Sequence, residues 1–203
     1  MMMDNNEIIQ EIKIVFIGPS NSGKTSILSK FMKSQKEVVP TVGCSFLVYP
    51  LYVNNQKIHF NFWDTCGTER FKSVAPFYYR NTQAVIAVID LTSQQSLSEA
   101  RSWIQEMKSH ERDIKFLALA ANKVDDTENR EISAEEIQSF KEDIGADFAI
   151  ETSAFKDIGI QELFQAIVRN VLDVPQTDKI YFNASLTPSK ESSSSSSSSS
   201  CCS

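Results

Sequence analysis

Residues 18–25, with the sequence GPSNSGKT, constrain the fold of this chain more than any other stretch. They lie between an apolar run at 12–17, which predicts a buried strand, and residues 26–33, which predict a helix. In this strand–loop–helix context, backbone N–H groups and the N-terminal end of the helix face phosphate oxygens. The loop therefore predicts a phosphate site in which Lys24 reaches the β- and γ-phosphates and the Thr25 hydroxyl binds Mg²⁺.

Length and composition narrow the class of protein. The 203 residues suit one folded domain rather than two, and a net charge of −6 without a basic stripe argues against a nucleic-acid partner. Cys44 and Cys66 are far apart, and Cys201 and Cys202 are adjacent. Because this spacing fits neither a disulfide framework nor a zinc site, we expect a reducing compartment. No signal peptide or membrane span is expected from the sequence.

Strand and helix patterns alternate along the chain. Strands are predicted at 12–17, 45–53, 57–64, 84–90, 114–121 and 148–151, and helices at 26–33, within 68–80, and at 93–110, 133–144 and 160–172. Asn54 and Asn55 predict a hairpin turn, and Ser133 with Glu136 predicts a capping box. The alternation predicts an α/β fold: a doubly wound, mostly parallel six-stranded sheet with helices on both faces. Ligands of such sheets bind at the carboxyl ends of the strands.

The alternating pattern ends near Asp173. Beyond it the chain is polar, and a serine run at 192–200 precedes the two adjacent cysteines. Such a segment buries too little apolar area to fold, so it predicts a flexible tether over 174–203.

Asp64 and Gly67 follow a predicted strand and are candidates for a second part of the phosphate site. A carboxylate at this strand end can hold Mg²⁺, commonly through water, and a glycine leaves its N–H free to meet a γ-phosphate. The alternative is an aspartate that only caps the next turn. The phosphate loop upstream favours the metal site.

Residues 122–125, with the sequence NKVD, predict selection of a base. Guanine presents N1–H and its exocyclic amine as adjacent donors, and the Asp125 carboxylate can accept both. The Lys123 stem can lie over the base plane, and backbone N–H groups of the segment 151–154 (ETSA) can meet guanine O6. Adenine offers no such donor pair, so an adenine-specific phosphate-loop enzyme is disfavoured.

These motifs, in this order and spacing, resemble those of the Ras superfamily of small GTPases over residues 12–172. The segments 62–65 (FWDT), 69–71 (ERF), 78–80 (YYR) and 90–92 (DLT) are similar to the Rab branch, and 74–80 resembles endosomal Rabs. The resemblance implies a small GTPase domain at 8–173 that binds GTP or GDP with Mg²⁺ and hydrolyses GTP.

The resemblance also implies a set of site residues. The nucleotide contacts would be Gly18, Ser20, Asn21, Ser22, Gly23, Lys24, Thr25, Ser26, Thr41, Asp64, Gly67, Asn122, Lys123, Asp125, Ser153, Ala154 and Phe155. Thr25, Thr41 and Asp64 would hold Mg²⁺, and Lys24 with Thr68 would act in catalysis. Gly43 and Phe46 would continue switch I after Thr41, and 64–80 would form switch II.

By resemblance, the protein is a switch in vesicle traffic that acts on the cytoplasmic face of intracellular membranes and cycles with the cytosol. The expected partners are effectors that read the switches, an exchange factor, an activator of the TBC type, and prenylation and membrane-extraction factors. Cys201 and Cys202 are similar to doubly geranylgeranylated Rab termini and would anchor the chain in a membrane.

Several positions depart from the family. Thr68 stands where the family usually has the glutamine that orients the attacking water, which predicts slow intrinsic hydrolysis. By resemblance, an activator of the TBC type can supply both an arginine and a glutamine, so that hydrolysis in its presence survives the loss. The alternative is a non-cycling GTP-bound scaffold. The stretch 24–41 is shorter than usual, and no aromatic residue between Phe31 and Phe46 is present to pack on guanine, which predicts faster GDP release.

Two smaller departures lie in the predicted nucleotide contacts. Asn21 replaces a glycine, but asparagine tolerates a left-handed backbone, so the loop is expected to form. Phe155 replaces the commoner lysine.

Overall fold

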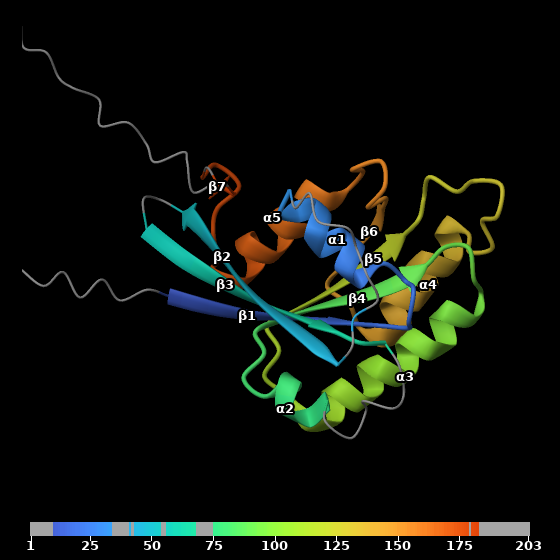
Figure 1. The fold of residues 1–203 in the computed structure, drawn as a ribbon, viewed down its shortest axis with the longest axis horizontal. Helices are drawn as coiled ribbons and strands as arrows, with labels where there is room; N and C mark the ends of the chain where they lie inside the picture. The colour runs from blue at the N-terminus through green and yellow to red at the C-terminus, as the bar shows by residue number, and fades with distance from the viewer. Residues whose placement is uncertain are drawn as a thin grey trace, which may run out of the picture.

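The computed structural model describes residues 10–33, 41, 43–53, 56–67, 75–178 and 180–182. Its strands are β1 (Gln10–Ile17), β2 (Cys44–Val53), β3 (Gln56–Thr65), β4 (Ala84–Asp90), β5 (Phe116–Asn122), β6 (Phe148–Thr152) and β7 (Ile180–Tyr181). Its helices are α1 (Lys24–Phe31), α2 (Ala75–Tyr79), α3 (Gln95–His110), α4 (Ala134–Ile144) and α5 (Ile160–Val171). Figure 1 shows these elements around one central sheet.

The strands form one sheet in the order β6-β5-β4-β1-β3-β2-β7. Strands β6, β5, β4, β1 and β3 are parallel, whereas β2 runs antiparallel to both β3 and β7. The predicted doubly wound, mostly parallel sheet of six strands is confirmed, and β7 is a short addition at its edge.

Helices cover both faces of the sheet. Figure 1 shows α1 and α5 on one side and α2 and α3 on the other. Because successive strand residues point to opposite faces, Ile14 and Phe16 of β1 pack with α1 and α5, while Val15 and Ile17 pack with α3 and α4. A strand covered on both faces reads as a continuous apolar run.

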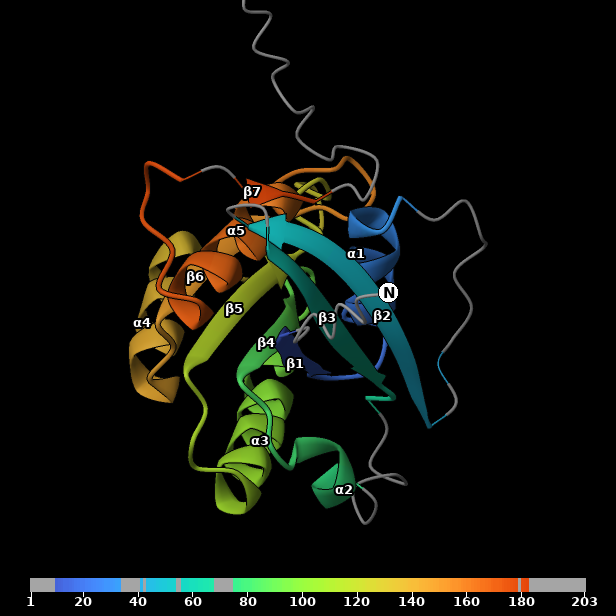
Figure 2. The ribbon, with the colours of Figure 1, turned by 90° about the vertical axis from the view of Figure 1, so that its left-hand side faces the viewer.

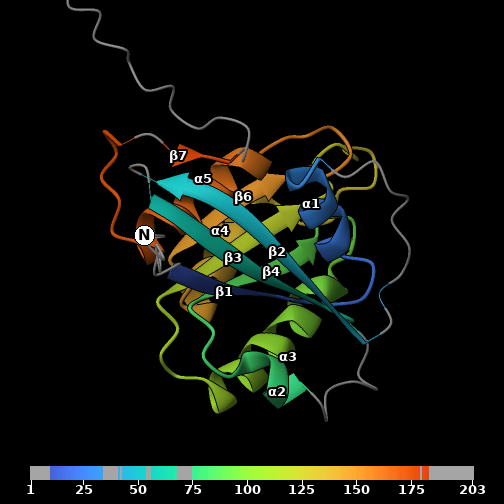
Figure 3. The same cartoon turned by 60° about the vertical axis from the view of Figure 1, so that its left-hand side comes forward.

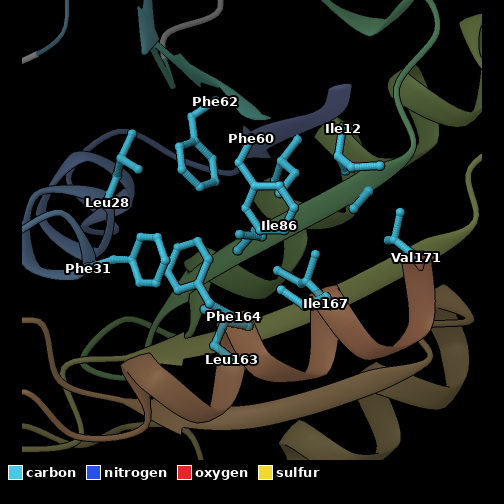
Figure 4. Close-up of a cluster of buried hydrophobic side chains, with 14 of the residues drawn as sticks. Ile12, Leu28, Phe31, Phe60, Phe62, Ile86, Leu163, Phe164, Ile167 and Val171 are labelled. Atoms are coloured by element: carbon cyan, nitrogen blue, oxygen red, sulfur yellow. The ribbon is translucent and has the colours of Figure 1, made fainter. Parts of the chain in front are cut away.

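Aromatic rings join α1 to α5 on one face of the sheet. Phe31 and Phe164 stack with ring centroids 3.6 Å apart, and the Phe62 ring of β3 meets Phe164 edge-on at 5.6 Å (Figure 4). Contacts of this kind add to the burial of apolar area. They hold the helix that follows the phosphate loop against the core.

The predicted capping box begins α4. The Ser133 hydroxyl accepts a hydrogen bond from the Glu136 N–H at 3.2 Å, and the Glu136 carboxylate accepts from the Ser133 N–H at 2.8 Å. Helix α1 instead begins at Lys24, before the predicted start at residue 26, because Gly23 with φ 97° serves as its N-cap. The phosphate-loop lysine is therefore the first residue of the helix.

Part of the segment expected to be a tether lies on the domain. Strand β7 pairs with Tyr52 and Val53 at the end of β2 (Figure 3), and the Arg169 guanidinium donates to the carbonyl oxygens of Pro175 and Asp178. Phe182 meets the Phe31 ring edge-on at 5.2 Å. The predicted start of the tether at residue 174 is therefore too early.

The physical reason is an open sheet edge beside an apolar surface. The end of β2 offers unpaired backbone groups, and Ile180 and Phe182 pack against the core cluster that includes Phe31. Two apolar side chains in a polar segment are enough to dock it where such an edge is available.

Some expectations lie outside the described residues. These are the turn at Asn54 and Asn55, the segment 68–74 with Thr68, and the end of the chain with Cys201 and Cys202. Among the helices in the described ranges, none combines the length and apolar character needed to cross a bilayer.

We predict that Phe182→Ala lowers the free energy of unfolding by about 1–2 kcal/mol, because the ring loses its packing on Phe31. Urea denaturation of the full chain measures the change. Phe77→Ala is the matched control, because that ring is 79% exposed and its loss is expected to cost less than about 0.5 kcal/mol. Equal midpoints for Phe182→Ala and the unmodified chain would contradict the docking.

Candidate functional site

The predicted site residues meet at the carboxyl ends of the parallel strands. The phosphate loop follows β1, Asp64 lies at the end of β3, Asn122 ends β5 and Ser153 follows β6. Segments far apart in the sequence thus share one edge of the sheet, as expected for this class of fold. Figure 2 shows the same sheet turned, with β2 and β3 toward the viewer.

The phosphate loop lies too close to the neighbouring strands for side chains at its glycines. A Cβ atom at Gly18, where φ is 133°, would lie 2.3 Å from the Val88 carbonyl oxygen. At Gly23 it would lie 2.1 Å from the Asn122 side-chain nitrogen. Asn21 has φ 62°, which confirms that asparagine takes the left-handed conformation expected here.

Lys24 lies buried inside the loop. Its ammonium donates hydrogen bonds to the carbonyl oxygens of Gly18 at 3.0 Å and Pro19 at 2.6 Å. Burial lowers the pKa of Lys24 to about 8, and the nearby Asp64 and Cys66 act in the opposite direction. The loop therefore contains a positive group at the place where the sequence predicts the β- and γ-phosphates.

Three oxygen-bearing side chains converge next to Lys24. The Thr25 hydroxyl donates to Asp64 Oδ2 at 2.6 Å, the Thr41 hydroxyl donates to the same oxygen at 3.0 Å, and the two hydroxyl oxygens are 2.8 Å apart. Burial raises the pKa of the Asp64 carboxyl, and the hydrogen bonds from Thr25 and Thr41 lower it. The three predicted metal ligands are thus brought together.

These residues fit Mg²⁺. The second oxygen of Asp64, Oδ1, is buried and has no hydrogen-bond partner among the described residues. Hydroxyl and carboxylate oxygens are the donors that Mg²⁺ prefers, and the ion usually keeps several waters instead of taking an all-protein cage. In the described ranges, no cluster of three or more His, Cys, Asp or Glu side chains offers another site for a metal.

Gly67 lies directly against the phosphate loop. A Cβ atom at this position would lie 2.4 Å from the Ser20 nitrogen and 2.4 Å from the Pro19 carbonyl carbon. The preceding N–H, that of Cys66, donates to the Gly43 carbonyl oxygen at 2.8 Å. The backbone bond joins the segment that follows β3 to the segment that carries Thr41, so the two predicted switches meet beside the loop.

A cavity of about 280 Å³ extends from the loop along the ends of β5 and β6. It is lined by nine residues, eight of them predicted nucleotide contacts: Asn21, Gly23, Ser26, Asn122, Lys123, Asp125, Asp126, Ala154 and Phe155. The motif at 122–125 and the motif at 151–154 therefore open into the same space, as a base pocket requires.

The buried Asn122 side chain ties the base pocket to the phosphate loop. Its amide nitrogen donates to the Ser22 carbonyl oxygen at 2.9 Å. Its oxygen accepts from the Thr152 hydroxyl and from the Ala154 N–H, each at 3.3 Å. One side chain thus fixes the positions of three segments that are distant in sequence.

Asp125 and Lys123 are held by different partners. The Ser153 hydroxyl donates to Asp125 Oδ1 at 2.5 Å, so the carboxylate has a fixed position at the cavity. The Lys123 ammonium lies 2.5 Å from Asp90 Oδ2, and Lys123 itself has φ 71°. Lys123 lines the cavity, while its ammonium is paired with Asp90, which is not among the lining residues.

Sequence reasoning assigned no role in the site to Asp90 or Arg130. Asp90 pairs with Lys123 and accepts the N–H and hydroxyl of Thr92 at 2.9 and 2.7 Å. Arg130 donates to both Glu151 carboxylate oxygens at 2.9 and 2.6 Å, next to the segment 152–154. Such pairs join residues that are distant in the sequence, so the spacing of single charged residues along the chain does not predict them.

A row of aromatic rings joins the two predicted switches, with Phe46 from the first, Tyr78 from the second and Trp63 between them. Phe46 and Trp63 have ring centroids 5.1 Å apart, and Trp63 and Tyr78 are 5.8 Å apart. Phe46 is 50% exposed and Phe77, next to Tyr78, is 79% exposed. Exposed apolar surface of this kind is typical of protein–protein contact.

Comparison with known proteins gives consistent matches. The family model described as "Ras family" matches residues 13–173. Ras-related protein Rab-31 of Homo sapiens is 38% identical over 165 residues, which cover 80% of this chain and 84% of that protein. Ras-related protein Rab5A of Oryza sativa subsp. japonica is 36% identical over 170 residues, 83% of each chain. Ras-related protein Rab-22A of Mus musculus is 36% identical over 172 residues, 84% of this chain and 87% of that protein.

We predict that Asn122→Ala lowers the free energy of unfolding by about 2–3 kcal/mol, because buried groups of the loop and of the segment after β6 lose their partner. Thermal or urea denaturation measures the loss. Asn129→Ala is the control, since its exposed amide bonds only the Asp126 side chain. A loss no larger than that of the control would show that Asn122 does not link these segments.

Proposed function

The chain belongs to the Rab branch of the Ras family of small GTPases, and from this premise we propose that it is a membrane-tethered GTP/GDP switch that recruits effectors in vesicle traffic. As a member of this family it is an enzyme that hydrolyses GTP to GDP and phosphate. The observation that carries the proposal is the convergence of Thr25 and Thr41 on Asp64. This contact joins the phosphate loop to both predicted switches at the place proposed for the metal.

The proposed cycle depends on what these residues do when a γ-phosphate is present. Lys24 would neutralise phosphate charge, Thr25, Thr41 and Asp64 would hold Mg²⁺, and the Gly67 N–H would be available to the γ-phosphate. When bound, Mg²⁺ neutralises charge that develops on the phosphate oxygens. A γ-phosphate would add a further ligand shared by the Thr41 segment and the Gly67 N–H, and its loss would weaken the hold on both switches and release them.

Effectors would read the aromatic row of Phe46, Trp63 and Tyr78. The row lies on β2, β3 and α2, close to Thr41 and Gly67, so its shape depends on the order of both switches. An exchange factor and an activator of the TBC type are the other partners proposed for this face. The function is recruitment of proteins, and GTP hydrolysis serves to end it.

Membrane attachment is proposed through Cys201 and Cys202. A single lipid chain binds membranes only marginally, so both cysteines are required. Prenylation and membrane-extraction factors would then move the protein between the cytosol and the cytoplasmic face of an intracellular membrane. The likeness of residues 74–80 to endosomal Rabs favours endosomes.

We predict that the purified protein binds GDP in preference to ADP and to IDP, because Asp125 accepts both N1–H and the exocyclic amine of guanine. Asp125→Ala is expected to weaken GDP binding at least ~100-fold and to abolish the preference for GDP over IDP. Equilibrium competition against a fluorescent guanine nucleotide, with Mg²⁺ present, measures both effects.

Asp126→Ala is the matched control for this experiment. Asp126 lines the same cavity, but its carboxylate accepts hydrogen bonds from Asn129. The control is expected to keep the preference for GDP. A wild-type protein that does not distinguish GDP from ADP would overturn the proposed function.

A second candidate, a GTP-bound scaffold that does not cycle, is favoured by Thr68, which lies outside the described residues. We predict slow single-turnover hydrolysis by the wild type and hydrolysis at least ~10-fold faster for Thr68→Gln, because the amide orients the attacking water. Phosphate release is measured with and without a TBC-type activator. Acceleration of the wild type by the activator supports the cycling switch, whereas no acceleration supports the scaffold.

A further inference from the structure

Phe155 is a large apolar side chain at the mouth of the base cavity. It lines the cavity together with Lys123, Asp125 and Ala154, and it is 83% exposed. Exposing a phenylalanine ring to water at this extent is unfavourable. A ligand that occupies the cavity would cover part of this ring.

The turn that carries Phe155 is held by several hydrogen bonds. Ser153 and Ile158 exchange two backbone hydrogen bonds, at 3.0 and 3.1 Å, which close the turn. The Ser153 hydroxyl accepts from the Lys156 N–H at 2.8 Å while it donates to Asp125. The Ala154 N–H is bonded to Asn122.

The turn and the Asp125 carboxylate, which is proposed to bind the base, are therefore positioned as one unit. Because the backbone on both sides of Phe155 is fixed before a ligand arrives, a contact by its ring costs side-chain entropy but little backbone entropy.

Phe155 is also the single aromatic residue among the nine that line the cavity. Residues 32–45, which include Thr41 and Gly43 of the predicted first switch, contain no aromatic residue. The Lys123 ammonium is paired with Asp90, so this side chain offers the cavity its aliphatic stem. A planar base in this cavity meets one aromatic surface in the described part of the chain.

We propose that the Phe155 ring stacks on the guanine base and sets the rate at which nucleotide leaves. The inference rests on the proposed function, since it requires the base to occupy this cavity. Stacking is available to any planar base, so Phe155 retains the nucleotide while Asp125 selects guanine. The ring thereby takes the place of the aromatic contact that the short first switch lacks.

The test is the rate of GDP release, followed with a fluorescent GDP analogue in the presence of Mg²⁺. Phe155→Ala is expected to release GDP about 5- to 100-fold faster than the wild type, the range that loss of one base–aromatic stack produces. Phe155→Tyr keeps an aromatic face and is expected to retain the wild-type rate within about threefold.

A second readout reports the contact itself. Phe155→Trp introduces an indole at the cavity, and its fluorescence is expected to fall when GDP is added, after subtraction of the signal from Trp63 and Trp103 in the wild type. A role limited to the folding of the turn does not produce such quenching.

Ile158→Ala is the matched control. Ile158 lies in the same turn with its side chain 45% exposed, and its bonds to Ser153 come from the backbone. Release of GDP by this variant is expected at the wild-type rate.

The possible outcomes separate the two proposals. If the wild type fails to bind GDP, the proposed function itself is wrong. If the wild type binds GDP and Phe155→Ala releases it at the wild-type rate, or if Ile158→Ala accelerates release as much as Phe155→Ala, stacking by Phe155 is wrong while the proposed function stands.

Discussion

The structure of this site depends on one buried carboxylate. Asp64 is 1% exposed, and a buried charge is tolerated only when it is paired or hydrogen-bonded. One of its oxygens accepts from Thr25 and Thr41, and the other has no partner among the described residues. The hydrogen bonds that satisfy this group join the start of α1, the segment that carries Thr41 and the end of β3. A divalent cation would satisfy the remaining oxygen of Asp64. Burial of this carboxylate therefore costs stability when no metal is bound and favours the binding of a metal.

The shape of the base pocket depends on a second side chain, Asn122, which is a hydrogen-bond partner of several segments. Asn122 holds the phosphate loop, the end of β5 and the turn after β6 in one arrangement. Gly23 lies so close to the Asn122 side chain that a residue with a Cβ atom would not fit at position 23. Phosphate recognition and base recognition therefore rest on the same backbone geometry. A change that moves one of these segments is transmitted to the other.

Much of this arrangement can be predicted from the sequence, because apolar runs mark strands and because the loop motifs require strand ends. The strand at Ala84–Asp90 and the capping box of Ser133 follow directly from local patterns. Contacts between single residues from segments distant in the sequence cannot be predicted in this way. The pair of Lys123 with Asp90 and the pair of Arg130 with Glu151 depend on the tertiary fold, and a two-residue strand such as β7 is too short to show periodicity.

Strand β7 has a consequence for the solubility of the protein. The outer edge of a sheet is a template on which a second molecule can add a strand and begin aggregation. At one end of β2 the backbone of Tyr52 and Val53 is already occupied by β7, and Pro50 beside them has no N–H to offer. Within the described ranges, the part of β2 without a second neighbouring strand is the end near Thr41, so β7 shields the sheet from self-association over the stretch farthest from the candidate switches.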